Sequence, residues 1–197
     1  MNYRGKYLKA LEKDCTELIV DAYHTAIIYK KYNIDWCEND FSELLAGYVN
    51  ENPCSLDKGI TCKTEQKISS SFRNQSKGFA DKLPRIDFVY SQIWGKQRFY
   101  CYMEAKRLKQ NDNKLKKRYI KEGIDSYISK KYPMGLMLGY LVEGQVNITV
   151  NGINALLKKD NRKKEVLKHK QQELLTTYYE SNHSQIGVLK HLIFDFT

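Results

Sequence analysis

The sequence lacks the cysteine spacing that disulfide frameworks and cysteine-ligated metal sites use. Its five cysteines are odd in number and form no C-x-x-C pair. Disulfide scaffolds contain paired cysteines, and zinc or iron–sulfur sites draw their ligands from closely spaced ones. The pattern indicates neither class and predicts reduced, structural cysteines.

Long apolar runs are lacking as well. No run approaches the roughly 20 residues of a membrane-spanning helix, and "MNYRGKYLKALEKDC" at the N-terminus has no apolar signal-peptide core. Low-complexity segments and recognisable repeats are also missing. We therefore expect a cytoplasmic protein that does not contact a membrane.

A chain of 197 residues is long enough for one well-buried domain and short for two, so we predict a single domain over residues 1–197.

The stretch "IDFVYSQIWGKQRFYCYMEAK" (residues 86–106) alternates apolar and polar side chains on both sides of "GK". This alternation is typical of strands, and a two-residue turn with glycine first is typical of a hairpin. If Gly95 and Lys96 form the turn, Trp94 pairs with Gln97 and the numbers of paired residues sum to 191. The stretch therefore predicts a β-hairpin with a defined register.

This register places Asp87 opposite Glu104, and like charges at directly paired positions destabilise a sheet unless something lies between them. A divalent cation would do so. Lys106 lies two residues beyond Glu104 and shares its face. The opposite face pairs Ile86 with Ala105, Phe88 with Met103 and Tyr90 with Cys101, and we expect that face to pack against a helix.

The residues "PRID" (84–87) and "EAK" (104–106) resemble the motif of the PD-(D/E)xK nucleases, the restriction-endonuclease-like superfamily. One departure is that the proline stands three residues before Asp87. The resemblance implies an α/β fold with a mixed central sheet flanked by helices. It also implies Mg²⁺, or Mn²⁺, bound by Asp87, Glu104 and the Ala105 carbonyl. Lys106 would orient or help to deprotonate the attacking water.

Many members of this superfamily supply a further acidic residue from a helix before the hairpin. By this resemblance Glu38 is the candidate, because it lies on the inward stripe of the helix expected over "WCENDFSELLAGYVNEN", whereas Glu43 is displaced outward. An acid at a helix entrance is also favoured by the helix dipole alone. Both readings of Glu38, and the choice between Glu38 and Glu43, stay open at this point.

A net charge of +10 predicts a polyanionic partner, since phosphates attract lysine-rich surfaces. Basic residues concentrate in residues 107–121 and 158–170. A charge run is usually a solvated helix face, and we assign that role to the second stretch. The first directly follows the expected catalytic strand, so we predict contacts with nucleic acid there from Lys114, Lys116, Lys117 and Arg118.

The function implied is metal-dependent hydrolysis of phosphodiester bonds, in DNA before RNA, with host defence or restriction as the commonest association. The alternative is a catalytically inactive nucleic-acid-binding module, or a subunit of a larger complex, with the same fold. The sequence leaves open a homodimer or a partner protein.

The remaining pattern predicts further elements. They are a long first helix with Leu8 to Ile27 at helical spacing, a helix capped by Asn39 or Asp40, a loop over most of residues 52–83, a helix over 115–128, a buried strand over 133–144, a helix over 145–159, and a C-terminal strand that pairs with the segment before it.

Overall fold

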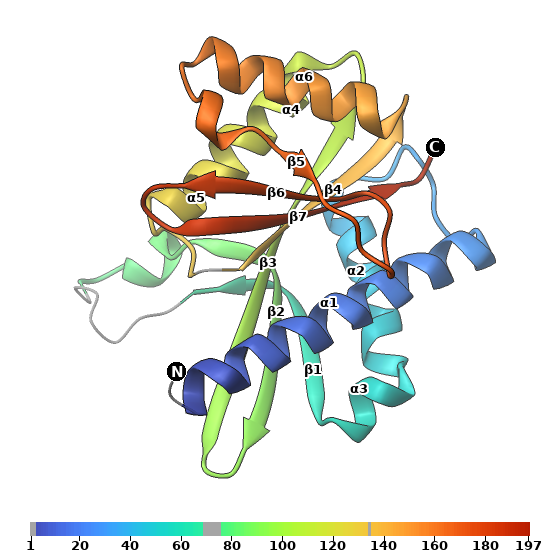
Figure 1. Cartoon of the computed structure of the whole chain (residues 1–197). Coiled ribbons are helices and arrows are strands. Elements are labelled where there is room, and N and C mark those ends of the chain that lie inside the picture. Colours follow the sequence, from blue (N-terminus) through green and yellow to red (C-terminus); the bar gives the residue numbers. More distant parts are fainter. Residues whose placement is uncertain (1–2, 69–75, 134) are drawn as a thin grey trace.

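The computed structural model describes residues 3–68, 76–133 and 135–197 (Figure 1). Its strands are β1 (Ile60–Lys67), β2 (Arg85–Trp94), β3 (Gln97–Lys109), β4 (Leu136–Glu143), β5 (Lys168–His169), β6 (Tyr178–His183) and β7 (Gly187–Asp195). Within the described residues these strands form one mixed sheet in the order β1-β2-β3-β4-β7-β6-β5. The β3-β4 and β4-β7 pairs are parallel and the others are antiparallel.

Helices cover both faces of this sheet. They are α1 (Tyr3–Tyr29), α2 (Glu38–Glu51), α3 (Pro53–Asp57), α4 (Asn113–Arg118), α5 (Asp125–Ile128) and α6 (Val146–Lys159), with the 3₁₀ turns η1 (Phe79–Lys82) and η3 (Lys163–Glu165) and the π-helical segment η2 (Tyr119–Ile124). Among the described residues, no helix is long and apolar enough to cross a membrane.

Two apolar clusters form the core, one on each face of the sheet. The first joins α1 and α2 to side chains such as Phe88, Met103 and Leu138. The second joins η2, α5 and α6 to side chains such as Leu108 and Met137. Neighbouring residues of β4 thus lie on opposite faces, as the period of two in a strand requires. The predicted α/β class, a mixed sheet flanked by helices, is confirmed.

The β2-β3 hairpin has the predicted register. Trp94 pairs with Gln97, and the numbers sum to 191 down to the pair of Phe88 with Met103. Gly95 has a φ of +59°, a conformation that glycine adopts without steric cost, so it suits the first turn position.

The prediction that Ile86 and Ala105 lie on the same apolar face is wrong. Phe88 and Tyr90 belong to the first core cluster with Ala105, but Ile86 belongs to the second. Glu65 of the neighbouring strand β1 lies between the partners of Phe88 and Ile86 and has a φ of +50°, so β1 departs from extended backbone at this position. The alternation of faces is therefore interrupted between Ile86 and Phe88.

The other elements follow the pattern with local differences. Helix α1 is confirmed, although Leu8 at its N-terminal end is exposed. Helix α2 begins at Glu38, before the predicted capping residues Asn39 and Asp40. Asp40 lies inside its first turn and accepts a hydrogen bond from the backbone N–H of Cys37 (2.9 Å).

The region predicted as a loop, residues 52–83, contains α3, β1 and η1, and its residues 69–75 lie outside the described residues. Strand β4, helix α6 and the antiparallel β6-β7 pair are all confirmed.

Candidate active site

The Lys106 ammonium lies among three carboxylates. Its Nζ is 2.7 Å from Glu104 Oε1, 2.9 Å from Glu38 Oε1 and 3.7 Å from Asp87 Oδ2. Nζ also donates a hydrogen bond to the Ala105 carbonyl (2.7 Å). We call Glu38, Asp87, Glu104 and Lys106 the carboxylate–lysine cluster. The structure thus brings together the four side chains that the sequence predicts for the site.

Each member is fixed by an element of the fold. Glu104 and Lys106 share one face of β3 because they are two residues apart. Asp87 projects from β2, and its Oδ2 accepts a hydrogen bond from the Ala105 N–H (2.6 Å). The paired residues of β2 and β3 end at Phe88 and Met103, just before this position, so the side chain satisfies an N–H that the sheet leaves free.

Glu38 is the first residue of α2 and reaches the same strand. Its Oε2 accepts a hydrogen bond from the Arg107 N–H (2.9 Å), while its Oε1 pairs with Lys106. Glu43 instead accepts a hydrogen bond from the Thr64 hydroxyl on β1. Of the two acids left open by the sequence, Glu38 is the one that lies at the cluster.

Burial makes the electrostatics of this cluster strong. Asp87, Glu104 and Lys106 are all at most 6% exposed. Burial, together with the charge of Glu104, raises the pKa of Asp87 to about 8, and burial also raises the pKa of Glu104. Burial lowers the pKa of Lys106, but the nearby carboxylates outweigh it and raise that pKa above its ordinary value. One ammonium therefore does not balance the negative charge of the cluster.

The donor set fits a hard divalent cation. Carboxylate and backbone carbonyl oxygens are the ligands that Mg²⁺ and Mn²⁺ prefer. Glu104 Oε2 is buried and has no hydrogen-bond partner, so one oxygen of the cluster is left with no partner group. In the described part of the chain no three His, Cys, Asp or Glu side chains already form a metal cage. Lys106, which contacts all three acids, lies where such a cage would close.

Residues outside the motif complete the surroundings. The Tyr132 hydroxyl donates a 3.4 Å hydrogen bond to Glu104 Oε1, and Arg118 is 3.9 Å from Glu38 Oε1. A side chain on Gly123 of η2 would meet Met137 at 2.3 Å, so glycine allows η2 to pack closely beside Lys106. Sequence reasoning missed Tyr132, which comes from a loop without periodic pattern.

The predicted nucleic-acid contacts on α4 divide into two groups. Lys114 and Lys117 are exposed, and Arg118 pairs with Glu122 (3.0 Å) at the edge of the cluster. Lys116 is buried and donates a 2.8 Å hydrogen bond to the Gln110 carbonyl. Its ammonium is therefore committed inside the protein, and this correction leaves Lys114, Lys117 and Arg118 as candidates for phosphate contacts.

A serine, a histidine and a glutamate elsewhere have hydrogen-bonding distances typical of a hydrolase triad. Ser181 Oγ is 2.6 Å from His183 Nε2, and His183 Nδ1 is 2.7 Å from Glu165. Ser181 is fully buried and also bonds His191 (2.7 Å). A nucleophile needs access to substrate, so we interpret this chain as a structural network of the second core.

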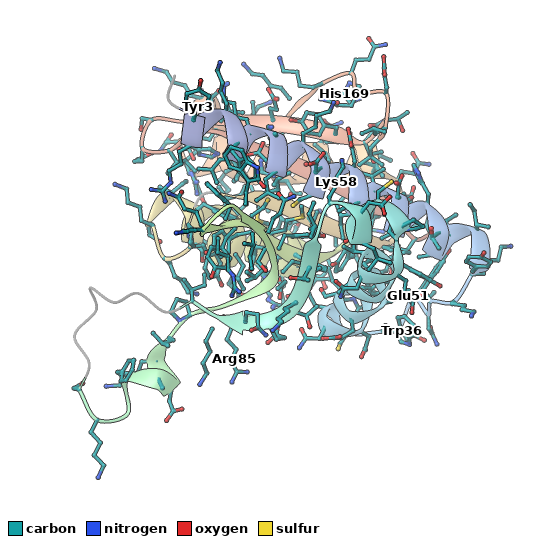
Figure 2. All side chains as sticks on the ribbon, turned by 90° about the horizontal axis from the view of Figure 1, so that it is seen from below. Tyr3, Trp36, Glu51, Lys58, Arg85 and His169 are labelled. Carbon is teal, nitrogen blue, oxygen red and sulfur yellow. The ribbon has the colours of Figure 1, made fainter. Side chains whose placement is uncertain are left out.

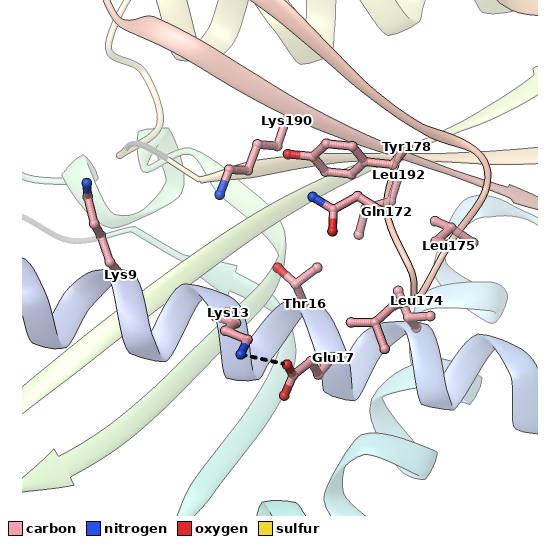
Figure 3. A pocket seen from close by; sticks show the side chains of 11 residues that line it. Lys9, Lys13, Thr16, Glu17, Gln172, Leu174, Leu175, Tyr178, Lys190 and Leu192 are labelled. Atoms are coloured by element: carbon pink, nitrogen blue, oxygen red, sulfur yellow. Dashed lines mark ion pairs between the residues drawn. The ribbon is translucent and has the colours of Figure 1, made fainter. Parts of the chain in front are cut away.

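A pocket between α1 and the segment before β6 lies away from the cluster. Figure 3 shows the residues that line it, among them Lys9, Lys13 and Glu17 of α1 and Leu174, Leu175 and Tyr178, with a Lys13–Glu17 ion pair of 3.6 Å. Leu175 and Tyr178 belong to the first core cluster, on the α1 side of the sheet. This pocket contains none of the predicted site residues.

Comparisons of the chain with protein-family models, curated proteins and solved structures found no match.

Proposed function

We propose that this chain is a metal-dependent nuclease that hydrolyses phosphodiester bonds in DNA, with a restriction-endonuclease-like fold. One observation carries the proposal: a buried lysine contacts three buried or half-buried carboxylates from two neighbouring strands and a helix. Purely structural burial of an ammonium among three carboxyl groups is costly, since desolvation of each ion opposes folding. A function that needs these charges explains why they lie together.

Asp87, Glu104 and the Ala105 carbonyl would hold Mg²⁺ or Mn²⁺. When bound, the cation supplies positive charge at the phosphate and an activated water. Hydrolysis of the phosphodiester adds water across one P–O ester bond, which yields a phosphomonoester and an alcohol.

Lys106 orients the attacking water and stabilises the negative charge that develops on the phosphate. Glu38 positions Lys106 through its ion pair and anchors the strand through the Arg107 N–H. Lys114, Lys117 and Arg118 on the neighbouring helix are available to contact phosphates of the substrate.

The second candidate function is a nucleic-acid-binding module without catalysis. It is favoured by the position of the Lys106 ammonium, which pairs with the carboxylates. A binding module keeps such a cluster only as an internal ion pair, whereas a nuclease needs it to accept a cation. Cleavage therefore separates the two.

We expect wild-type protein to cleave at least one member of a substrate panel in Mg²⁺ or Mn²⁺ and none in EDTA. The panel contains linear, circular, single-stranded and branched DNA, and RNA. Glu104→Gln, purified in parallel, is the control, because it removes a carboxylate charge with almost no change in shape. Equal nicking by both proteins would reveal a contaminant, and cleavage of nothing by wild type would favour the binding module.

A further inference from the structure

The sheet face that carries Glu104 and Lys106 continues along β3 toward the turn of the hairpin. Tyr100 and Tyr102 lie on this face of β3 because they precede Glu104 at a period of two. Figure 1 shows β2 and β3 extending past the helices on this side, and Tyr100 is 42% exposed. The opposite face of the same strands is closed by α1 and α2 through Cys101 and Met103. One face of the hairpin is therefore core and the other is open.

Three strands arrange the open face in rows. Lys63, Val89 and Tyr102 form one row across β1, β2 and β3. The next position of this face along β3 holds Glu104, two residues or roughly 7 Å from Tyr102. A ligand lying along this face would thus end at the carboxylate–lysine cluster.

The face is hollowed into a groove. We define the tyrosine groove by six of its lining residues: Lys63, Lys67, Val89, Arg98, Tyr100 and Tyr102. The two tyrosine rings have centroids 6.0 Å apart and an interplanar angle of 26°, so they present flat surfaces of similar orientation. Tyr102 packs partly against the second core, which fixes its ring. Rigid aromatic surfaces of this kind stack nucleic-acid bases without regard to sequence.

Positive charge surrounds these rings. Lys67 forms an exposed 3.7 Å ion pair with Asp81, while Lys63 and Arg98 have no ion pair within the part of the chain that the structure describes. Arg85, at the start of β2, projects away from the ribbon at the lower edge of Figure 2 and lies 4.0 Å from Glu65. Basic side chains beside stacked tyrosines match a ligand that combines phosphates with exposed base faces.

We propose that the tyrosine groove binds single-stranded DNA, with bases stacked on Tyr100 and Tyr102 and phosphates contacting Lys63 and Arg98. A duplex keeps its bases paired and stacked on each other, so it offers no free base face to the tyrosines. The proposal rests on the proposed nuclease function, for which it names the substrate form: a single strand guided along β3 to the carboxylate–lysine cluster.

The test is binding of a fluorescently labelled single-stranded DNA, measured by anisotropy in EDTA so that cleavage plays no part. A duplex and an RNA strand of the same length and sequence are the comparison ligands. The variants are Tyr100→Ala, Tyr102→Ala and Tyr100→Phe, with Tyr29→Ala as the matched control, since Tyr29 is an exposed tyrosine at the end of α1.

We expect wild type to bind the single-stranded DNA more tightly than the duplex and no less tightly than the RNA. Each alanine variant in the groove should weaken this binding about tenfold or more, while Tyr100→Phe and Tyr29→Ala stay close to wild type. Because Tyr100 is exposed, Tyr100→Ala is expected to keep the wild-type melting temperature, which excludes unfolding as the cause.

The outcomes distinguish this inference from the proposed function. If wild type cleaves DNA but the groove variants bind and cleave like wild type, the groove proposal is overturned and the nuclease stands. If wild type cleaves nothing but loses single-strand binding in the alanine variants, the groove stands and the nuclease fails. A preference for duplex, or tighter binding of RNA than of DNA, also overturns the groove proposal.

Discussion

Lys106→Met is expected to cleave DNA roughly 10²–10⁴-fold more slowly than wild type, the range found when a group that assists the reaction at the water or phosphate is removed. Methionine keeps an unbranched apolar stem of similar length but has no ammonium to orient water or to stabilise charge on the phosphate. The measurement is the initial rate of cleavage at saturating Mg²⁺ on the substrate that wild type cuts best.

Lys109→Met is the matched control for this rate. Lys109 lies on the same strand, and its ion pair with Glu143 (3.1 Å) is on the surface. The control should cleave within a few-fold of wild type. A Lys106→Met rate as high as that of Lys109→Met would remove Lys106 from the reaction.

The same substitution is expected to lower the free energy of unfolding by about 3–5 kcal/mol in EDTA, because it leaves buried carboxylates without their cation. Glu104, at most a few per cent exposed, loses its 2.7 Å partner, and Glu38 and Asp87 lose theirs. Lys109→Met removes an exposed pair instead and should cost about 0–1 kcal/mol. Urea unfolding of the two variants and of wild type measures the difference. Equal stability of the two variants would show that the buried ion pairs of Lys106 contribute no more to stability than the exposed pair of Lys109.

The hairpin and its register follow from local information, which is why the sequence predicts them. Alternation with a period of two, and a glycine in the turn, specify which residues pair before any other part of the fold is known. The prediction fails at Ile86, beside the departure from extended backbone at Glu65, which belongs to a strand that the sequence does not reveal. Strand β1 itself reads as a polar loop, because "ITCKTEQK" lies at the sheet edge and most of its outward side chains are exposed.

In the candidate site, too, the sequence predicts the residues placed by local spacing and misses those placed by the tertiary fold. Glu104 and Lys106 share a face by spacing alone, whereas Tyr132 reaches Glu104 from a loop and has no pattern to reveal it. For Lys116 the sequence pattern predicts a role that the fold does not allow. It reads as one more cation in a basic run, yet Gly152 of α6 leaves the space that its ammonium occupies, since a Cβ there would lie 2.8 Å from Lys116 Nζ. Such tertiary packing is not encoded in the run itself.

The central claim is that Asp87 and Glu104 hold a divalent cation beside Lys106. Thermal unfolding with increasing Mn²⁺, compared with EDTA, reports this binding, because a ligand that binds only the folded state stabilises it by about 2.7 kcal/mol at 100 times its Kd. Asp87→Asn keeps the shape and an acceptor for the Ala105 N–H but removes the charge. Asp81→Asn, which alters an exposed acid paired with Lys67, is the control. We predict that the melting temperature of wild type and of Asp81→Asn rises with Mn²⁺ and that Asp87→Asn loses most of this rise; an equal rise in all three proteins would contradict the claim.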